Sequence, residues 1–316
     1  MKTFQQPLPN FEIKKMRILI TGATGLIGSE LVALLLQNGI EVHYLTTSKK
    51  KINKEEKYQG FFWNPAQGII DENCLIGVDA IIHLAGASIA KRWTNTYKQE
   101  IIESRIASSN TLYKALKENP HQVKQIVSAS GTAIYPDSDT AIYNELSIAT
   151  QDNFLSNVVV KWEESVNKFK QLDIKVCKIR TGIVFAKNGG ALQEMIKPIR
   201  FGFGAAFGNG KQITSWIHIH DLAAMYFFAV KNQWEGTYNA VSPNPISNQA
   251  LTKALAEKLH KPLFLPNIPR FVMKWMLGEM HELLFTNKNI SSQKAIDAGF
   301  TFQFPTTEKA LSNIIS

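Results

Sequence analysis

Residues 17–28 read RILITGATGLIG, and this stretch decides how the chain folds. The first four residues form a short apolar run of the kind that makes a buried strand. A turn with glycines in the spacing G-x-x-G-x-x-G follows, and then a helix-like stretch from Leu26 to Gln37 that ends at Asn38-Gly39. A strand, a glycine-rich turn and a helix in this order predict a dinucleotide-binding site.

The glycines of the turn are Gly22, Gly25 and Gly28. Glycine is needed where the backbone turns tightly, approaches a pyrophosphate, or packs a helix closely against a strand. The N-terminus of the helix presents unpaired N–H groups and a partial positive charge, which favour a phosphate there. The alternative, a plain strand-to-helix turn, lacks the context of further strands and helices described next.

The alternation of strands and helices continues along the chain. We expect strands at 41–46, 79–85, 125–130 and 175–179, and helices at roughly 95–118 and 152–171. Strands that alternate with helices form parallel βαβ units with helices on both faces of the sheet. The sequence therefore predicts an α/β fold with a doubly wound parallel sheet of the Rossmann type.

The second strand indicates which dinucleotide is bound. An NAD site usually places Asp or Glu about 20 residues beyond the glycines, where it bonds the ribose hydroxyls. Here no acid occurs between Val42 and Glu55. A 2′-phosphate needs hydroxyl and cationic partners, and its expected position is lined by Thr47, Ser48, Lys49 and Lys50. We expect NADP(H) rather than NAD, with Ser48 and Lys49 as 2′-phosphate ligands.

Composition excludes several classes of protein. The 45% hydrophobic share fits a globular chain, and no apolar run approaches the ~18 residues of a membrane span. The net charge of +9 comes from scattered lysines and arginines without interleaved aromatics, which is not the pattern of a single-strand nucleic-acid binder. Two cysteines and no apolar leader indicate a reducing compartment. We expect a cytoplasmic protein with no nucleic-acid or membrane partner; the oligomeric state stays open.

The chain divides into a nucleotide-binding part and a smaller lobe. We expect an N-terminal extension at 1–15 and an NADP-binding Rossmann domain at 16–185, completed by 213–240. The remaining segments, 186–212 and 241–316, are richer in glycine and proline and form the expected substrate lobe.

The motifs resemble those of the extended short-chain dehydrogenase/reductases, the NAD-dependent epimerase/dehydratase superfamily. After the glycine-rich turn come IIHLAG (81–86), SAS (128–130) and RTGIV (180–184). A narrower resemblance, to the "epimerase family protein" subgroup with a C-terminal domain of unknown function, covers nearly the whole chain from Met16. It rests on short motifs that include RW (92–93), SRI (104–106), WE (162–163), SWIH (215–218) and NAVSPNP (239–245).

The resemblance implies roles for individual residues. It assigns the phosphate-binding loop to Gly22, Thr24, Gly25, Leu26, Ile27 and Gly28. It assigns further cofactor contacts to Ala85, Gly86, Ser128, Arg180, Thr181 and Gly182, and it places Ser130 at the position of the catalytic serine or threonine.

One departure from the family pattern concerns catalysis. Relatives that transfer hydride use a Tyr-x-x-x-Lys pair, in which the lysine lowers the pKa of the tyrosine so that the phenol exchanges a proton with the substrate. Here Val158 and Trp162 stand at those positions. Tyr135, on the loop after Ser130, is the predicted substitute donor, with Arg180 among the cations that would lower its pKa. The alternative is a tyrosine that packs under the loop.

Other polar residues receive simpler interpretations. Glu163 is interpreted as a carboxylate on the surface of its helix; the alternative is that it faces the pocket. His218 and His220 supply too few ligands for a zinc site, so we expect no metal, and Asp221 is interpreted as the cap of the following helix. His83 is expected to bond locally within the sheet.

Two functional hypotheses remain. The first is an atypical NADP(H)-dependent oxidoreductase or epimerase that acts on a small carbonyl or sugar-like substrate. The second is a non-catalytic NADP-binding regulatory or interaction protein. The missing Tyr-x-x-x-Lys pair favours the second hypothesis, whereas Ser130, Tyr135 and a full substrate lobe favour the first.

Overall fold

The computed structural model describes residues 16–147, 150 and 152–315. The predicted N-terminal extension, residues 1–15, lies outside this part of the chain. Within the described residues, no helix combines the length and the apolar character needed to cross a membrane.

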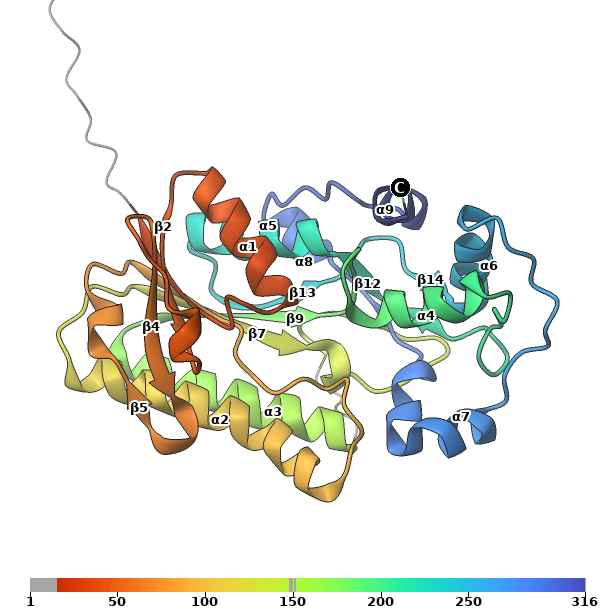
Figure 1. Cartoon of the computed structure of the whole chain (residues 1–316), viewed down its shortest axis with the longest axis horizontal. Coiled ribbons are helices and arrows are strands. Elements are labelled where there is room, and N and C mark those ends of the chain that lie inside the picture. The colour runs from red at the N-terminus through yellow and green to blue at the C-terminus, as the bar shows by residue number, and fades with distance from the viewer. Residues whose placement is uncertain (1–15, 148–149, 151, 316) are drawn as a thin grey trace, which may run out of the picture.

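A mostly parallel sheet forms the centre of the molecule (Figure 1). Its strands follow the order β13-β9-β7-β6-β1-β2-β4-β3, and β5 pairs with β4. Neighbours from β13 to β4 run parallel, whereas β3 and β5 are antiparallel to β4. The strands are β1 (Arg17–Thr21), β2 (Glu41–Thr46), β3 (Lys54–Glu55), β4 (Tyr58–Asn64), β5 (Ile69–Ile70), β6 (Ala80–His83), β7 (Gln125–Gly131), β9 (Lys175–Thr181) and β13 (Gly236–Ala240).

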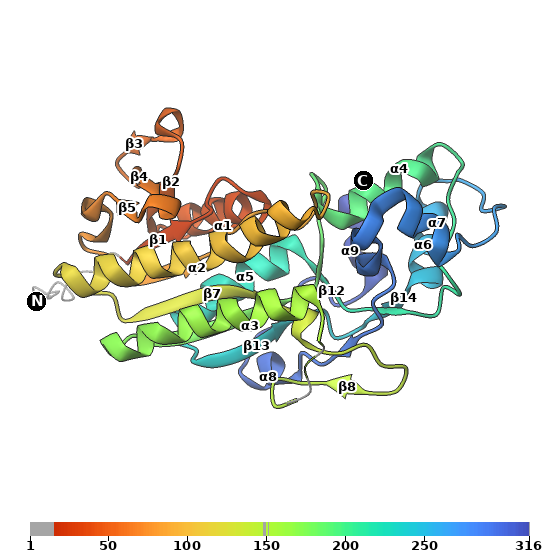
Figure 2. The same ribbon diagram turned by 90° about the horizontal axis from the view of Figure 1, so that it is seen from below.

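Helices cover both faces of this sheet. One face is covered by α1 (Leu26–Gln37) and α5 (Ile219–Lys231), and the other by α2 (Asn95–Glu118) and α3 (Phe154–Asn167) (Figures 1 and 2). The run Ile18-Leu19-Ile20 is apolar throughout for this reason. Ile18 and Ile20 pack into the core beneath α1 and α5, and Leu19 packs into the core beneath α2 and α3.

The direction of winding reverses between β1 and β6. From β1 the chain moves outward to β2 and β4, and it then returns to β6 and continues on the other side to β7, β9 and β13. Ligands of doubly wound sheets bind at the carboxyl ends of the strands at this reversal. The ends of β1 and β6 therefore mark where a cofactor site is expected.

The C-terminal lobe is built mainly from short helices and two-stranded ribbons. Its helices are α4 (Gly190–Arg200), α6 (Asn248–Lys258), α7 (Arg270–Leu277) and α9 (Thr307–Ile314), while α8 (Gln293–Asp297) lies against β13. The ribbons pair β10 (Ile183–Phe185) with β12 (Trp216–His218), β11 (Ile213–Thr214) with β14 (Ile246–Ser247), and β15 (Asn289–Ile290) with β8 (Ile142–Tyr143). An apolar cluster that includes Phe185, Leu192, Trp216 and Leu311 holds α4, α6 and α9 together.

The predicted fold class is confirmed, and each predicted strand and helix has a counterpart in the structure. The predicted helix at 152–171 is shorter, because α3 ends at Asn167 and continues as a 3-10 turn to Leu172. The sequence analysis did not predict β4. Gly60 interrupts its apolar run, and a side chain there would come within 2.5 Å of the Tyr44 ring.

Candidate cofactor and active site

The glycine-rich turn is shaped by close contacts of the backbone. Gly22 has φ +74°, and a Cβ there would lie 3.1 Å from the carbonyl carbon of Leu84 after β6. A Cβ at Gly28 would lie 2.1 Å from the carbonyl oxygen of Gly22, which no side chain can tolerate. Glycine at these two positions allows the turn to lie against β6 and α1 to pack on the turn.

Gly25 is the N-cap of α1 and offers the first helical turn to a ligand. No side chain caps this helix, and its first turn contains no acid. A Cβ at Gly25 would meet only the carbonyl oxygen of Gly22, at 3.3 Å. Space and uncapped N–H groups at a helix N-terminus suit a phosphate, so the turn, which also contains Thr24, Leu26 and Ile27, fits the predicted pyrophosphate cradle.

A buried histidine joins the strands beneath the cradle. His83, at the end of β6, bonds Thr21 Oγ1 at the end of β1 through Nδ1 (2.8 Å). Thr21 Oγ1 accepts the N–H groups of Leu84 and Ala85, so its own hydrogen goes to His83, whose Nε2–H then points to Ser109 Oγ on α2. The predicted bonding within the sheet is thus only part of its role. Burial, with a smaller effect from Arg105, lowers the pKa of His83 to about 3.

Ala85 and Gly86 follow β6 in the loop that contacts α2 at Ser104 and Arg105. A Cβ at Gly86 would lie 3.1 Å from the side chain of Arg105. Arg105 NH1 donates to the carbonyl oxygens of Ala87 and Ile101, which fixes the guanidinium beneath this loop.

Ser48 and Lys49 follow β2 at the opposite end of the predicted cofactor groove. Ser48 is half-buried and its N–H donates to Thr46 Oγ1 (3.2 Å). Lys49 is exposed and its ammonium lies 5.2 Å from the centre of the Phe62 ring. Both residues thus lie just after β2, and their selectivity for a 2′-phosphate stays a prediction.

The residues predicted on β7 and β9 lie in register with one another. Ser130 pairs with Arg180, and Gly131 with Thr181. Gly182 needs to be glycine, because a Cβ there would lie 2.5 Å from the carbonyl oxygen of Ser215. Ser128 is fully buried and its hydroxyl donates a hydrogen bond to the carbonyl oxygen of Ala129, so it stabilises the end of β7.

Ser130 belongs to a buried network of ionic hydrogen bonds. Its hydroxyl donates to Glu163 Oε1 on α3 (2.7 Å), and Arg180 binds both carboxylate oxygens of Glu163 (2.8 and 3.0 Å). Lys178 lies 3.3 Å from Glu163 Oε2. Burial would raise the pKa of Glu163, but the hydrogen bonds and charges of Arg180, together with Lys178 and Ser130, outweigh burial and hold that pKa below its ordinary value.

The interpretation of Glu163 as a surface carboxylate is therefore wrong. The side chain is buried against β7 and β9, and it is the hub that joins Ser130 to Arg180. Helical periodicity did not reveal this, because a carboxylate can be buried only where cations compensate it, and those cations come from another element.

Tyr135 packs under the loop, which was the alternative interpretation of this residue. It is fully buried, its hydroxyl accepts from Arg180 NH1 (2.9 Å), and it donates to Asn239 Oδ1 on β13 (2.8 Å). Burial raises the pKa of Tyr135 and outweighs the opposite effect of Arg180. The expected lowering of this pKa is therefore wrong in direction, and the role of Tyr135 as proton donor stays a prediction.

The positions of the missing catalytic pair are filled by packing residues. Val158 belongs to an apolar cluster with Trp93 and Ile101. Trp162 lies under the guanidinium of Arg105, 4.8 Å from the ring centre, so a cation from α2 lies beside the site where the family places its lysine. Burial lowers the pKa of Arg105 to about 10, which leaves it charged at neutral pH. Among the described residues, Arg105 Nε and Trp162 Nε1 are buried without a hydrogen-bond partner.

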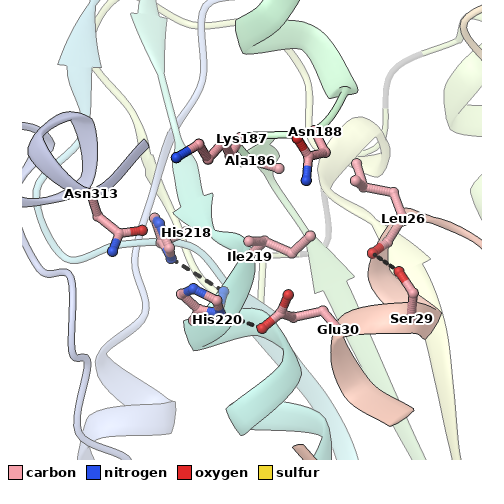
Figure 3. Close-up of a pocket in the computed structure, with 10 residues that line it drawn as sticks. All are labelled: Leu26, Ser29, Glu30, Ala186, Lys187, Asn188, His218, Ile219, His220 and Asn313. Atoms are coloured by element: carbon pink, nitrogen blue, oxygen red, sulfur yellow. Dashed lines mark hydrogen bonds and ion pairs between the residues drawn. The ribbon is translucent and has the colours of Figure 1, made fainter. Parts of the chain in front are cut away.

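A cavity of about 420 Å³ lies beside the first turn of α1 (Figure 3). Its walls come from α1, the segment after β10, the start of α5 and the C-terminal helix α9: Leu26, Ser29, Glu30, Ala186, Lys187, Asn188, His218, Ile219, His220 and Asn313. The N-termini of two helices and the C-terminal lobe thus meet next to the phosphate cradle. This arrangement places polar groups of both lobes around one space.

The histidines at this cavity have structural partners. His218 Nδ1 accepts the backbone N–H of His220 and caps α5, and His220 pairs with Glu30 on α1. Burial, with a smaller effect from His220, lowers the pKa of His218 to about 4. The predicted cap by Asp221 is wrong, because its carboxylate instead accepts the backbone N–H groups of Gln303 and Phe304. No cluster of three metal-binding side chains occurs among the described residues.

Sequence reasoning missed three residues that organise the site: Arg105, Glu163 and Asn239. Each stands in a short motif on which the subgroup resemblance rests, namely SRI, WE and NAVSPNP. Their presence in these motifs was a usable signal, because buried charged and amide groups need hydrogen-bond partners elsewhere in the fold.

Comparison with protein families covers both lobes. A model of the NAD dependent epimerase/dehydratase family matches residues 18–240, and a model of a domain of unknown function, DUF1731, matches residues 268–314. The chain is 33% identical over 302 residues to the epimerase family protein YfhF of Bacillus subtilis, covering 95% of this chain and 98% of that relative. A Staphylococcus aureus protein, epimerase family protein SAR0825, is also 33% identical, over 300 residues, covering 94% and 98%.

Comparison with solved structures also finds epimerases that superpose on nearly the whole chain. The structure of human epimerase family protein SDR39U1 with NADPH superposes with a TM-score of 0.81 at 29% identity, covering 95% of this chain and 99% of that one. A nucleoside-diphosphate sugar epimerase from Corynebacterium glutamicum superposes with a TM-score of 0.75 at 27% identity, covering 95% and 58%.

Proposed function

Because this chain belongs to the NAD dependent epimerase/dehydratase family, we propose that it is an NADP(H)-dependent oxidoreductase or epimerase that acts on a hydroxyl or carbonyl group of a small, sugar-like substrate. The observation that carries the proposal is the hydrogen bond from Ser130 to Glu163, at the carboxyl end of β7 and two strands from the phosphate cradle. Buried ionic hydrogen bonds at that edge of a doubly wound sheet are typical of a working site.

NADP(H) is proposed over NAD on two grounds. The end of β2 offers Ser48 and Lys49 and no carboxylate up to Glu55. The human relative was solved with NADPH. When bound, the cofactor supplies or accepts the hydride.

We propose that Ser130 handles the substrate oxygen. Its hydrogen is directed at Glu163, so its lone pairs remain available to accept a hydrogen bond from a substrate hydroxyl. When that hydroxyl is oxidised, its proton passes to Ser130 Oγ as Ser130 passes its own proton to Glu163 Oε1. In the reverse direction both protons return.

The same network limits the rate. Arg180 and Lys178 hold the pKa of Glu163 below its ordinary value, so protonated Glu163 is an unfavourable state. Because a base with a low pKa accepts a proton only weakly, we expect slower turnover than a Tyr-x-x-x-Lys pair gives. Tyr135 and Asn239 are proposed as positioning residues that hold Arg180 against Glu163.

A kinetic experiment tests this proposal. NADP⁺ reduction is followed with a panel of sugars, nucleotide sugars and small alcohols, and NADPH oxidation with the matching carbonyls. With any substrate found, Ser130→Ala and Glu163→Gln should each lower kcat by ~100-fold, the scale of a lost proton-transfer group. The control is Glu164→Gln, since Glu164 is exposed on the same helix. NADPH binding without turnover of any substrate would favour the non-catalytic hypothesis, and full activity in Glu163→Gln would exclude the proton path.

A further inference from the structure

Two stretches of the C-terminal lobe carry cations and no acid. Residues 197–211 and 258–276 contain no Asp or Glu, and we call them together the apolar–basic surface. Their exposed cations are Lys197, Arg200, Lys211, Lys258, Lys261, Arg270 and Lys274. The flanking acids Glu194, Glu257 and Glu279 are each paired with a lysine. Glu194 pairs with Lys197, one of the seven surface cations, whereas Glu257 and Glu279 pair with Lys253 and Lys98 outside the two stretches, so the surface keeps an excess of positive charge.

The two stretches lie side by side. The N–H of Gly208 donates to the carbonyl of Ile268 (2.9 Å), and the N–H of Ile268 donates to the carbonyl of Ala206 (2.8 Å). A Cβ at Gly204 would lie 2.7 Å from Leu263. In Figure 1, α4, α6 and α7 gather at the end of the molecule opposite β4. The charges and apolar groups of both stretches thus belong to one end of the protein.

Large apolar side chains project from this surface. Nine such side chains of the described residues are more than half exposed, and six of them belong to it: Phe201, Phe203, Phe264, Phe271, Trp275 and Met276. Trp275, on α7, is 85% exposed. Single exposed apolar residues are ordinary, but such a concentration on one surface marks an interaction site.

The surface is also hollowed. A cavity of about 460 Å³ lies between the segment at Ala205-Ala206, α6 and the loop that leads to α7. Its lining includes Leu263 and Leu265 together with Lys253, Lys261 and Glu257; Glu257 pairs with Lys253, which leaves Lys261 for a head group. A lipid with an anionic head group presents the complementary combination, a hydrocarbon chain next to a negative charge.

Charge selects among the possible occupants. A second copy of the chain is disfavoured, because a two-fold interface would place this acid-free surface against itself. A single nucleic-acid strand would match the cations and the aromatic rings of this surface. It would leave Leu263, Leu265 and Met276 without a partner, because a base stacks on a ring and these side chains have none. A membrane with anionic lipids satisfies both the cations and the aliphatic side chains.

We propose that the apolar–basic surface docks this protein on membranes that contain anionic lipids. Leu263-Phe264-Leu265, between Pro262 and Pro266, and the exposed residues of α7 enter the interface between head groups and hydrocarbon, where tryptophan is favoured. The lysines and arginines hold the head groups. Docking on the membrane surface requires no spanning helix, so it is compatible with the described residues, none of whose helices could cross a membrane.

Vesicle binding tests the proposal with the full-length protein. The protein is sedimented with vesicles of phosphatidylcholine alone and with vesicles that also contain phosphatidylglycerol. Binding is expected only to the second kind and is expected to weaken as salt is raised, because the head-group attraction is screened. Free inorganic phosphate at matched charge should not displace the protein, since it offers no hydrocarbon.

Paired variants separate this surface from the rest of the chain. Phe264→Ser together with Trp275→Ser should weaken vesicle binding by about 10-fold or more, because each side chain loses its burial in lipid. The matched control is Ile76→Ser together with Ile142→Ser, at exposed apolar residues outside the surface. Lys261→Gln with Lys274→Gln should weaken binding, whereas Lys54→Gln with Lys57→Gln on the other lobe should not.

Several results would overturn the proposal. One is equal binding of the protein to both kinds of vesicle. Another is an equal loss of vesicle binding in the surface variants and in their controls. A third is no binding to either kind of vesicle at low salt. A dimer that dissociates in Phe264→Ser with Trp275→Ser would assign the surface to a second copy. An oligonucleotide complex lost in the same variant would assign it to nucleic acid.

Discussion

Gly25 and Gly28 belong to one turn but are glycine for different reasons. A Cβ at Gly28 would collide with the backbone of Gly22 at 2.1 Å, whereas a Cβ at Gly25 would meet only one oxygen at 3.3 Å. Gly28→Ala should therefore destabilise the protein without cofactor by ~1–3 kcal/mol or more, the scale of overpacking. Gly25→Ala should leave that stability nearly unchanged and weaken NADPH binding.

Thermal unfolding with and without NADPH measures both effects. A ligand that binds only the folded state raises Tm by mass action, so the rise in Tm reports cofactor affinity. Gln37→Ala, at an exposed position of the same helix, serves as the control for Gly28→Ala. An unchanged NADPH-induced rise in Gly25→Ala would show that the phosphates bind elsewhere.

Ser48 and Lys49 carry the proposed preference for NADP(H). We expect NADPH to raise Tm more than NADH at equal concentration, and Ser48→Ala with Lys49→Ala to narrow that difference, because the 2′-phosphate loses a hydroxyl and a cation. Lys54→Ala, at an exposed lysine further along the chain, is the control. Equal rises in Tm for both nucleotides in the parent protein would contradict the NADP(H) proposal.

Tyr135 distinguishes a proton donor from a positioning residue. Tyr135→Phe leaves Arg180 NH1 and Asn239 Oδ1 without their partner, so unfolding free energy should fall by ~1–3 kcal/mol. Turnover should fall less than in Ser130→Ala. A ~100-fold loss of kcat with unchanged stability would instead restore the donor role that the sequence predicts.

At the scale of elements, His83 joins β1, β6 and α2 through one imidazole. Its two ring nitrogens bond Thr21 on β1 and Ser109 on α2, and this arrangement needs the neutral ring. The ordinary pKa of 6.5 falls to about 3 in the folded protein, mainly because the ring is buried. The contribution of His83 to folding therefore depends on pH.

The sign of this dependence follows from proton binding. Below about pH 6.5 the unfolded chain protonates His83, whereas the folded protein does so only near pH 3. The stabilisation is complete above pH 6.5 and is lost progressively as pH falls toward 3, because the unfolded state binds more protons in that window. Chemical unfolding at several pH values should show His83→Gln to be less stable at pH 7 and to have a flatter profile below pH 6.5. The control is His260→Gln, at an exposed histidine, which should keep the pH dependence of unfolding free energy seen in the parent protein. The role of His83 would be contradicted if His260→Gln flattened that dependence, or if His83→Gln left it unchanged.

At the scale of the whole molecule, the sheet and its helices followed from local sequence. Apolar runs such as 17–20 and the glycine spacing indicate these elements independently, so their positions could be predicted. The strand β4 could not, since Gly60 is explained by the Tyr44 ring of a neighbouring strand. The strand pairings of the C-terminal lobe could not be predicted either, because strands of two residues such as β8 and β15 are too short to show an alternation of apolar and polar residues.

The candidate site was predictable only in its outline. The proposed phosphate cradle is local in sequence, so its glycines could be proposed from their spacing alone. The Ser130 network could not, because Glu163 and Arg180 come from α3 and β9, and Asn239 comes from β13. Which of these charges is buried depends on how the three elements pack together. The same packing buries Tyr135, and this burial raises its pKa where the sequence analysis expected a lowered one.

We propose that NADP(H) lies across the carboxyl ends of β2, β1 and β7, with its reactive ring next to Ser130. A crystal structure of the protein with NADPH measures this most directly. We predict the pyrophosphate at the N–H groups of the first turn of α1, the 2′-phosphate in contact with Ser48 and Lys49, and the nicotinamide beside the Ser130 hydroxyl. A 2′-phosphate that contacts neither residue, or a nicotinamide bound away from Ser130, would contradict the account.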